Sequence, residues 1–222
     1  MIVDAASITH SCMSAIVDTA PDWTMRVADA LAHGRAAIVP DVLPGATVRA
    51  LREHALALEA SGQFHPARIG HHRGRHLDAG VRGDRIAWLS CADDMPAERA
   101  YCACMEALRQ CLNRELMLGL VELEAHYALY PSGAAYARHR DTFRDDDARV
   151  VSVIVYLNDA WTAAEGGALR LHVSASHVED VLPVGGTLAA FASQAFEHEV
   201  LPATRPRLAI AGWLRRRARV PW

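Results

Sequence analysis

The sequence contains no lysine, and each of its 23 basic side chains is an arginine. We interpret this as a bias toward arginine codons that says little about function. The 26 acidic residues outnumber the basic ones, and the formal net charge is −3. A chain of this charge has no global field that would attract nucleic acid or an anionic membrane surface, so we expect neither as a partner.

No stretch of the chain approaches the length of a membrane span, and residues 1–20 lack the basic and apolar regions of a secretion signal. We therefore expect a cytoplasmic protein. Cysteine is also scarce. The five cysteines are an odd number, and the closely spaced pair Cys102 and Cys104 has no second pair at metal-ligand spacing. Reduced, structural thiols are the expected state in a reducing compartment.

Helical periodicity dominates the first half of the chain and short β-type runs dominate the second. A length of 222 residues suits one domain, which we place at residues 21–222 after a loose segment at 1–20. Apolar spacing and end signals predict helices over 22–33, 46–60 and 96–117, strands over 36–43 and 84–89, and a long surface loop over 63–83. The fold class predicted is α+β, a double-stranded β-helix (jelly roll, cupin-like) core at about 121–214 braced by N-terminal helices.

His139 and Asp141 stand two positions apart in a segment predicted to be extended. Residues i and i+2 of a strand point to the same face with Cα atoms about 6.5 Å apart, so both can reach one metal ion. With a distant histidine, such a pair forms the two-histidine, one-carboxylate triad of non-haem Fe(II) sites, which leaves positions open for a chelating cosubstrate and O2. His198, on a later predicted strand, is the candidate third ligand.

A second His-x-Asp pair, His76 and Asp78, lies in the loop-like region. With twelve histidines in the chain, on the order of one such pair is expected by chance, so the motif alone does not choose between them. No apolar run follows His76 and Asp78, whereas His139 and Asp141 precede a convincing buried strand over 150–158. We therefore favour the later pair.

Arg207 follows His198 by nine residues, on a neighbouring predicted strand. An arginine there can bind the distal carboxylate of a dicarboxylic cosubstrate through two parallel charge-assisted hydrogen bonds. Taken singly, His198 is equally well explained as a core histidine and Arg207 as a surface arginine. Their joint spacing favours a cosubstrate site.

Several motifs between residues 38 and 213 carry a family resemblance. They are Val81-Arg-Gly-Asp-Arg-Ile-Ala-Trp88, Tyr130-Pro-Ser-Gly-Ala-Ala-Tyr136-Ala-Arg-His139-Arg-Asp141, Arg149 through Tyr156-Leu-Asn, Gly166-Gly-Ala-Leu-Arg170, and His198-Glu-Val through Arg207 and Trp213. In them the chain resembles the prolyl 4-hydroxylase branch of the 2-oxoglutarate oxygenases, particularly the hypoxia-inducible-factor prolyl hydroxylases and their small bacterial relatives.

The resemblance implies which residues line the cosubstrate pocket. Tyr156 joins Arg207 on the distal carboxylate, and Tyr130, Leu169 and Trp213 lie around the cosubstrate. Core packing is an equally good explanation of Leu169 and Trp213. Two departures from the animal enzymes bear on substrate geometry: the segment between Tyr130 and His139 is one residue shorter, and Ala211 replaces a frequent hydroxyl side chain.

The resemblance also implies residues on the substrate side. Arg82 and Asp84 close the 63–83 loop, which in relatives is a mobile finger that folds over the peptide. Asp84 is expected to pair with Arg149, and Tyr136 to line the pocket.

The activity implied is that of a dioxygenase that uses Fe(II), 2-oxoglutarate and O2, with ascorbate as reductant. It hydroxylates C4 of a prolyl residue in a protein and releases succinate and CO2, and analogy with bacterial relatives makes elongation factor Tu the first substrate to expect. The main alternative is a free amino acid or other small molecule as substrate. A non-catalytic cupin-like metal-binding module and a zinc hydrolase remain further alternatives, although both leave Arg207 without a role. Nucleic-acid dealkylation is disfavoured because Trp213 stands where that group has a second arginine.

Overall fold

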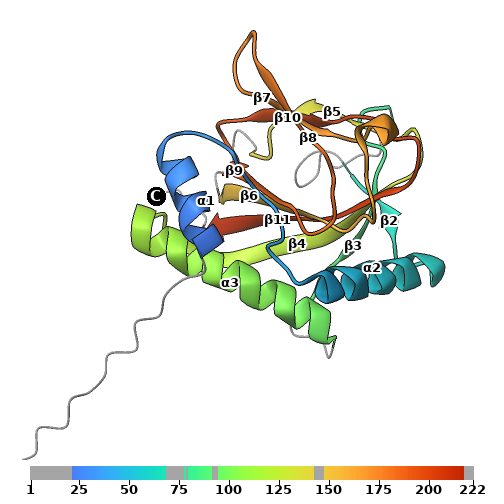
Figure 1. Cartoon of the computed structure of the whole chain (residues 1–222), viewed down its shortest axis with the longest axis horizontal. Coiled ribbons are helices and arrows are strands. Elements are labelled where there is room, and N and C mark those ends of the chain that lie inside the picture. The colour runs from blue at the N-terminus through green and yellow to red at the C-terminus, as the bar shows by residue number, and fades with distance from the viewer. Residues whose placement is uncertain (1–21, 69–77, 79, 92–94, 143–147, 218–222) are drawn as a thin grey trace, which may run out of the picture.

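Two antiparallel sheets face each other, and helices cover the outer face of the larger one (Figure 1). The structure is a computed structural model that describes residues 22–68, 78, 80–91, 95–142 and 148–217. The larger sheet has the strand order β1 (Ala37–Val39), β9 (Leu188–Ala192), β6 (Arg149–Tyr156), β11 (Arg207–Arg216), β4 (Leu120–Tyr130), β3 (Arg85–Trp88) and β2 (His65–Pro66). The smaller sheet has the order β5 (Tyr136–His139), β10 (Glu197–Val200), β7 (Leu169–His172) and β8 (Val178–Val181). This arrangement confirms the predicted α+β jelly roll.

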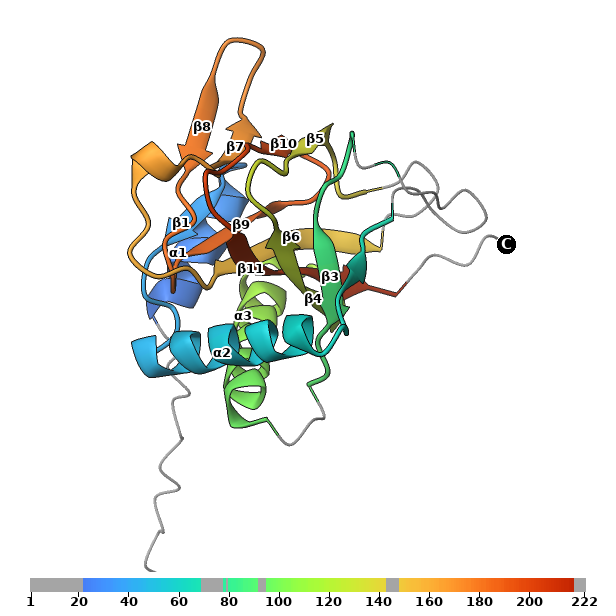
Figure 2. The same ribbon diagram turned by 90° about the vertical axis from the view of Figure 1, so that its right-hand side faces the viewer.

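Three α-helices occur in the described part of the chain, and they confirm the three predicted from periodicity. They are α1 (Asp22–Ala32), α2 (Gly45–Ala60) and α3 (Pro96–Leu116), and a short 3-10 helix, η2, spans Ala163–Glu165. Helix α3 buries one stripe that recurs every three or four residues, at Tyr101, Met105, Leu108, Cys111 and Leu112. Figure 2 shows α2 and α3 on one side of the large sheet and the β7–β8 hairpin projecting on the other.

The alternation of side chains along β11 connects the core to the site. Leu208, Ile210 and Leu214 belong to the cluster packed against the helices, whereas Ala209 belongs to a second cluster between the sheets. Because successive strand residues point to opposite faces, Arg207 and Trp213 share the inner face with Ala209. The hydrophobic pattern of one strand therefore directs Arg207 into the space between the two sheets.

Some expected elements differ from the observed ones. The strand expected over 36–43 is limited to β1, because Pro40 and a left-handed Asp41 turn the chain toward α2. The expected loop over 63–83 contains the short strand β2, and residues 69–77 lie outside the described residues, as does the segment predicted to be loose at 1–20. Helices long and apolar enough to cross a membrane are absent from the described residues.

The expectation that all cysteines are reduced is wrong for one pair. Cys91 and Cys102 form a disulfide, with their Cα atoms 5.8 Å apart. Cys91 follows β3 at the approach to α3, and Cys102 lies in the second turn of that helix, so the fold brings them within bonding range. Sequence spacing alone did not reveal this proximity. Cys104 and Cys111 are free thiols.

Candidate metal centre and cosubstrate pocket

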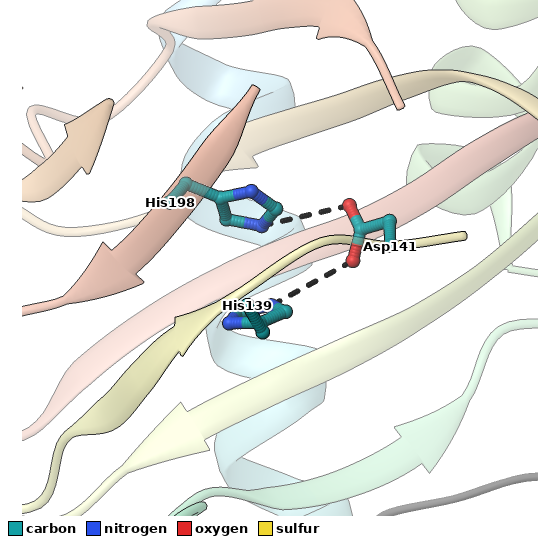
Figure 3. Close-up of side chains that lie close together, drawn as sticks. All are labelled: His139, Asp141 and His198. Atoms are coloured by element: carbon teal, nitrogen blue, oxygen red, sulfur yellow. Dashed lines mark ion pairs between the residues drawn. The ribbon is translucent and has the colours of Figure 1, made fainter. Parts of the chain in front are cut away.

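His139, Asp141 and His198 meet between the two sheets and point toward one another (Figure 3). His139 ends β5 and lies directly opposite His198 of β10 in the strand register. Asp141 completes the group, with His139 Nε2 3.7 Å from its Oδ1 and His198 Nε2 3.6 Å from its Oδ2. One potential ligand atom from each residue lies within 4.8 Å of the others, close enough for all three to share one metal ion.

The hydrogen bonds of the two imidazoles suit metal binding. His139 Nδ1 is 2.8 Å from the carbonyl oxygen of Ala137, and His198 Nδ1 is 3.3 Å from that of Phe196. With a proton on each Nδ1, the lone pair of each Nε2 faces the position where the three residues can share a metal ion. Metal-ligating histidines adopt this tautomer. Two neutral imidazoles and one carboxylate are the donor set of a non-haem Fe(II) triad, so the residues present fit this metal.

The surroundings set the charge states of His139 and Asp141. Burial, reinforced by His198, lowers the pKa of His139 to about 4, so its ring is neutral near pH 7. Burial alone raises the pKa of Asp141, but His198, His139 and Ser152 outweigh it and lower the pKa to about 2. Asp141 is therefore an anion when His139 is neutral.

Two buried serines form a hydrogen-bonded chain behind Asp141. Ser152 donates to Asp141 Oδ2 at 2.6 Å, and the hydroxyls of Ser152 and Ser193 lie 2.9 Å apart. Both serines are fully enclosed, at 1% and 0% exposure. Outer hydrogen bonds of this kind fix the direction in which a ligating carboxylate points. Sequence reasoning missed both residues, although Ser152 shares a strand face with Tyr156 four positions later.

A cavity of about 300 Å³ lies beside the triad, against the inner face of the large sheet. At one end, Arg207 is 2% exposed and its guanidinium carbon lies 5.2 Å and 5.1 Å from the ring centres of Tyr130 and Tyr156. Arg207 lines the cavity, and its Nε donates to the carbonyl of Gly167 at 2.8 Å. Leu169 also lines this region.

This end is built to receive an anion. Within the described residues the buried Arg207 donates to a backbone carbonyl and pairs with no carboxylate, and the buried Tyr156 hydroxyl has no hydrogen-bond acceptor. Burial raises the pKa of Tyr156 to about 12, so the phenol keeps its proton and remains a donor. A cation and a phenol donor side by side match a ligand carboxylate. The structure thus brings together Arg207, Tyr156, Tyr130 and Leu169 as the sequence predicted, whereas Trp213 lies beside Arg149 instead.

The remaining wall of the cavity is polar and aromatic. Arg82 and Asp84 form a two-point ion pair, with hydrogen bonds of 2.7 and 3.0 Å. Arg149 donates to Glu124 at 2.6 Å, and its guanidinium lies 3.5 Å from the ring centre of Trp213. The expected pair between Asp84 and Arg149 is therefore replaced by two separate pairs. Asp84 takes a partner two residues away, and Arg149 takes one on the far side of β11.

Tyr136 connects the substrate side to the metal centre. Its ring stacks on His139 with centres 3.6 Å apart, and Arg82 lies 4.8 Å from its centre. His126 also lines the cavity, a residue that sequence reasoning missed. The sequence did contain a signal for His126: it lies four residues before Tyr130 on the same predicted strand, and hence on the same face. The competing pair does not form a cluster in the described residues, because His76 lies outside them.

Comparisons with known proteins agree with this geometry. Residues 125–215 match the family model described as the 2OG-Fe(II) oxygenase superfamily. The chain is 32% identical to prolyl hydroxylase EGLN3 of Mus musculus over 63% of its own length and 59% of that protein, and 30% identical to Egl nine homolog 1 of Homo sapiens over 79% and 42%. It thus spans about half the length of such relatives.

Solved structures give fuller coverage. A prolyl-4-hydroxylase of Pseudomonas putida superposes with a TM-score of 0.79 at 41% identity, covering 87% of this chain and 99% of that one. A prolyl hydroxylase of Trichoplax adhaerens, solved with a hypoxia-inducible-factor oxygen degradation domain peptide, superposes with a TM-score of 0.79 at 27% identity, covering 86% and 88%. The similarity therefore includes the helices as well as the β-helix core.

Proposed function

Because the chain belongs to the 2OG-Fe(II) oxygenase superfamily, within its prolyl hydroxylases, we propose that it is a 2-oxoglutarate-dependent dioxygenase that hydroxylates C4 of a prolyl residue in a protein. The observation that carries the proposal is one cavity lined by two kinds of site: the triad of His139, Asp141 and His198, and Arg207, which lies against the Tyr130 and Tyr156 rings. A triad alone would also suit other metals. The buried arginine is what favours a dicarboxylate cosubstrate.

In this proposal the triad holds Fe(II). Bound Fe(II) supplies an oxidation in which O2 and 2-oxoglutarate are converted to succinate and CO2 while the second oxygen atom enters a substrate C–H bond. The protein's own contribution is positional. Ser152 and Ser193 fix Asp141, and the two backbone carbonyls fix the imidazoles.

Arg207 and Tyr156 orient the cosubstrate. They hold its far carboxylate by charge-assisted hydrogen bonds at the end of the cavity, so its reactive end lies toward the triad. The apolar side chains of Leu169, Ile154 and Val200 line the cavity that holds both the triad and Arg207, and they limit the access of water. A dry, pre-oriented site keeps the oxidising chemistry directed at the substrate.

The target polypeptide binds against the part of the cavity wall formed by Arg82, Asp84, Tyr136 and Arg149. The complex of the Trichoplax adhaerens relative with a peptide supports a polypeptide substrate for this type of site. Elongation factor Tu is the first candidate, by analogy with bacterial relatives. Ascorbate serves as the reductant that keeps the metal in its ferrous state.

The test is peptide mapping by mass spectrometry after candidate proteins are incubated with the chain, Fe(II), 2-oxoglutarate and ascorbate. The expected result is one added oxygen on a proline of elongation factor Tu, together with succinate. A His139→Ala/Asp141→Ala double variant is the control and should leave the protein unmodified. Succinate release with hydroxylation of free proline, and of no polypeptide, would replace the proposal with the small-molecule alternative.

A further inference from the structure

His126 is a buried polar residue in the cavity wall that neither the triad nor the carboxylate site uses. It lies on β4, is 2% exposed, and its Nδ1 has no hydrogen-bond partner within the described residues. Native proteins pair nearly all buried polar atoms, and an exception in a binding cavity calls for an explanation. A ligand that enters the cavity is the natural source of the missing partner.

Two indole rings fix the orientation of His126. The Trp88 ring centre lies 5.3 Å away with the rings at 82°, and the Trp213 centre lies 5.5 Å away at 69°. Both are edge-to-face contacts, which favour a defined geometry. An imidazole held from two sides has little freedom to turn toward another protein group. Its two nitrogen atoms are therefore held in a fixed orientation relative to a ligand in the cavity.

The strand register places His126 far from the carboxylate site. Tyr130 pairs with Arg207, whereas His126 pairs with Ala211 on one side and with Trp88 on the other. Four residues of strand separate His126 from Tyr130, a Cα distance of about 13 Å. Arg82, Asp84 and Arg149, which the proposed function assigns to the polypeptide, all lie close enough to His126 to influence its pKa.

Neighbouring groups indicate what His126 can recognise. Trp88 is 58% exposed, and a large exposed aromatic beside a cavity is typical of a surface that contacts another chain. Burial, together with Arg82 and Arg149, lowers the pKa of His126 to about 4, although Asp84 acts in the opposite direction. The neutral ring offers one donor and one acceptor, which suits a peptide amide better than an anion.

We propose that His126 is a substrate-recognition residue whose Nδ1 hydrogen-bonds a main-chain amide group of the polypeptide beside the target proline. The inference rests on the proposed function, since it requires a polypeptide in the cavity. It goes beyond that function by assigning to this chain a contact that selects a peptide backbone over a free amino acid.

The test compares His126→Leu with His126→Asn, two side chains of similar shape of which Asn alone has polar atoms near the Nδ1 position. The probes are purified elongation factor Tu, a hypoxia-inducible-factor oxygen degradation domain peptide and free L-proline. His126→Leu should raise the KM for the polypeptide by about threefold to tenfold, the effect of one neutral hydrogen bond. His126→Asn should recover most of it, and the KM for 2-oxoglutarate should stay within about twofold in both.

His33→Leu, at an exposed histidine beyond α1, is the matched control and should leave all constants unchanged. If His126→Leu does not fold, His126→Gln replaces it, because the amide of Gln lies one bond farther out than Nδ1. The KM for the polypeptide should then be lower in His126→Asn than in His126→Gln. Equal polypeptide KM values in all variants, with hydroxylation retained, would overturn the role of His126 and leave the proposed function intact. Hydroxylation of free proline alone by the unaltered chain would overturn both.

Discussion

Arg207 is a buried cation that faces two tyrosine rings and, within the described chain, no carboxylate. Arg207→Lys keeps the charge but removes the planar fork that binds a carboxylate at two points. We expect the KM for 2-oxoglutarate to rise by about tenfold to a hundredfold, the range for a lost hydrogen bond to a charged group. Steady-state succinate assays over a range of 2-oxoglutarate measure this. An unchanged KM would place the cosubstrate carboxylate elsewhere.

Ser152 is the residue that directs Asp141. Ser152→Ala should weaken metal binding by about tenfold to a hundredfold, the usual effect of losing an outer hydrogen bond to a ligand. Ser152→Thr keeps the hydroxyl and should restore binding, and Ser193→Ala should have a smaller effect because Ser193 acts through Ser152. Titration with Co(II), followed by its visible spectrum, measures affinity independently of turnover. Equal affinities in Ser152→Ala and the unaltered chain would contradict this role.

His126 also makes the folded chain sensitive to acid. Its folded pKa of about 4 lies below the ordinary value of 6.5, so as the pH falls the unfolded chain takes up a proton first and stability is lost. The desolvation of the ring is the main cause, and Arg82 and Arg149 add to it. Between pH 7.5 and pH 5 the metal-free chain should lose about 2 kcal/mol more than His126→Asn.

Urea denaturation of both metal-free proteins at the two pH values measures the difference. The contributions of His139 and other shared groups cancel in the comparison, since both proteins contain them. Parallel loss of stability in the two proteins would mean that His126 is already protonated, or exposed, in the folded state.

The turn before β7 shows how one element supports the cosubstrate site. Gly167 has a left-handed φ of +72°, and a Cβ there would lie 2.9 Å from Ala203 Cβ and 3.1 Å from Trp161 Cζ2. Gly167→Ala should therefore shift this turn, whose Gly167 carbonyl accepts from Arg207 Nε, and so raise the KM for 2-oxoglutarate as well as lower stability. Gly34→Ala is the matched control, because Gly34 has a similar φ of +66° but no atom within 4 Å of its Cβ position.

Isothermal calorimetry with 2-oxoglutarate and thermal unfolding separate the two effects. Backbone strain alone should lower the unfolding temperature of both variants, whereas weaker cosubstrate binding should appear only in Gly167→Ala. Equal 2-oxoglutarate affinity in the two variants would show that Arg207 adjusts to the crowding.

Helices and strands with a regular apolar pattern could be predicted from the sequence. Individual contacts between side chains, which leave no such pattern, could not. Helix α3 was predicted because its apolar residues recur at helical spacing, and β6 because of its continuous apolar run. The ion pairs of Asp84 and Arg149 were predicted wrongly, because partner choice depends on which side of a strand each guanidinium reaches. The disulfide of Cys91 and Cys102 depends on how β3 approaches α3, a tertiary feature with no local signal.

At the scale of the whole molecule, the site forms because two sheets of different sizes face each other. His139 and His198 come from the small sheet, and Arg207, Tyr156 and Ser152 from the large one. The spacing of His139 to Asp141, and of His198 to Arg207, could be read from sequence because strand alternation fixes those directions. The strand face of His126 could be read in the same way, but its two indole neighbours and the contact of Ser193 with Ser152 could not, because they lie on other strands.

Metal analysis combined with a 2-oxoglutarate turnover assay tests the central claim most directly. The unaltered chain, reconstituted anaerobically, should bind one Fe(II) and form succinate when 2-oxoglutarate and O2 are supplied together with a polypeptide substrate. His139→Ala/Asp141→Ala should lose both the metal and the succinate. A chain that retains zinc in preference to iron and forms no succinate under any of these conditions would contradict the assignment of the triad and of Arg207.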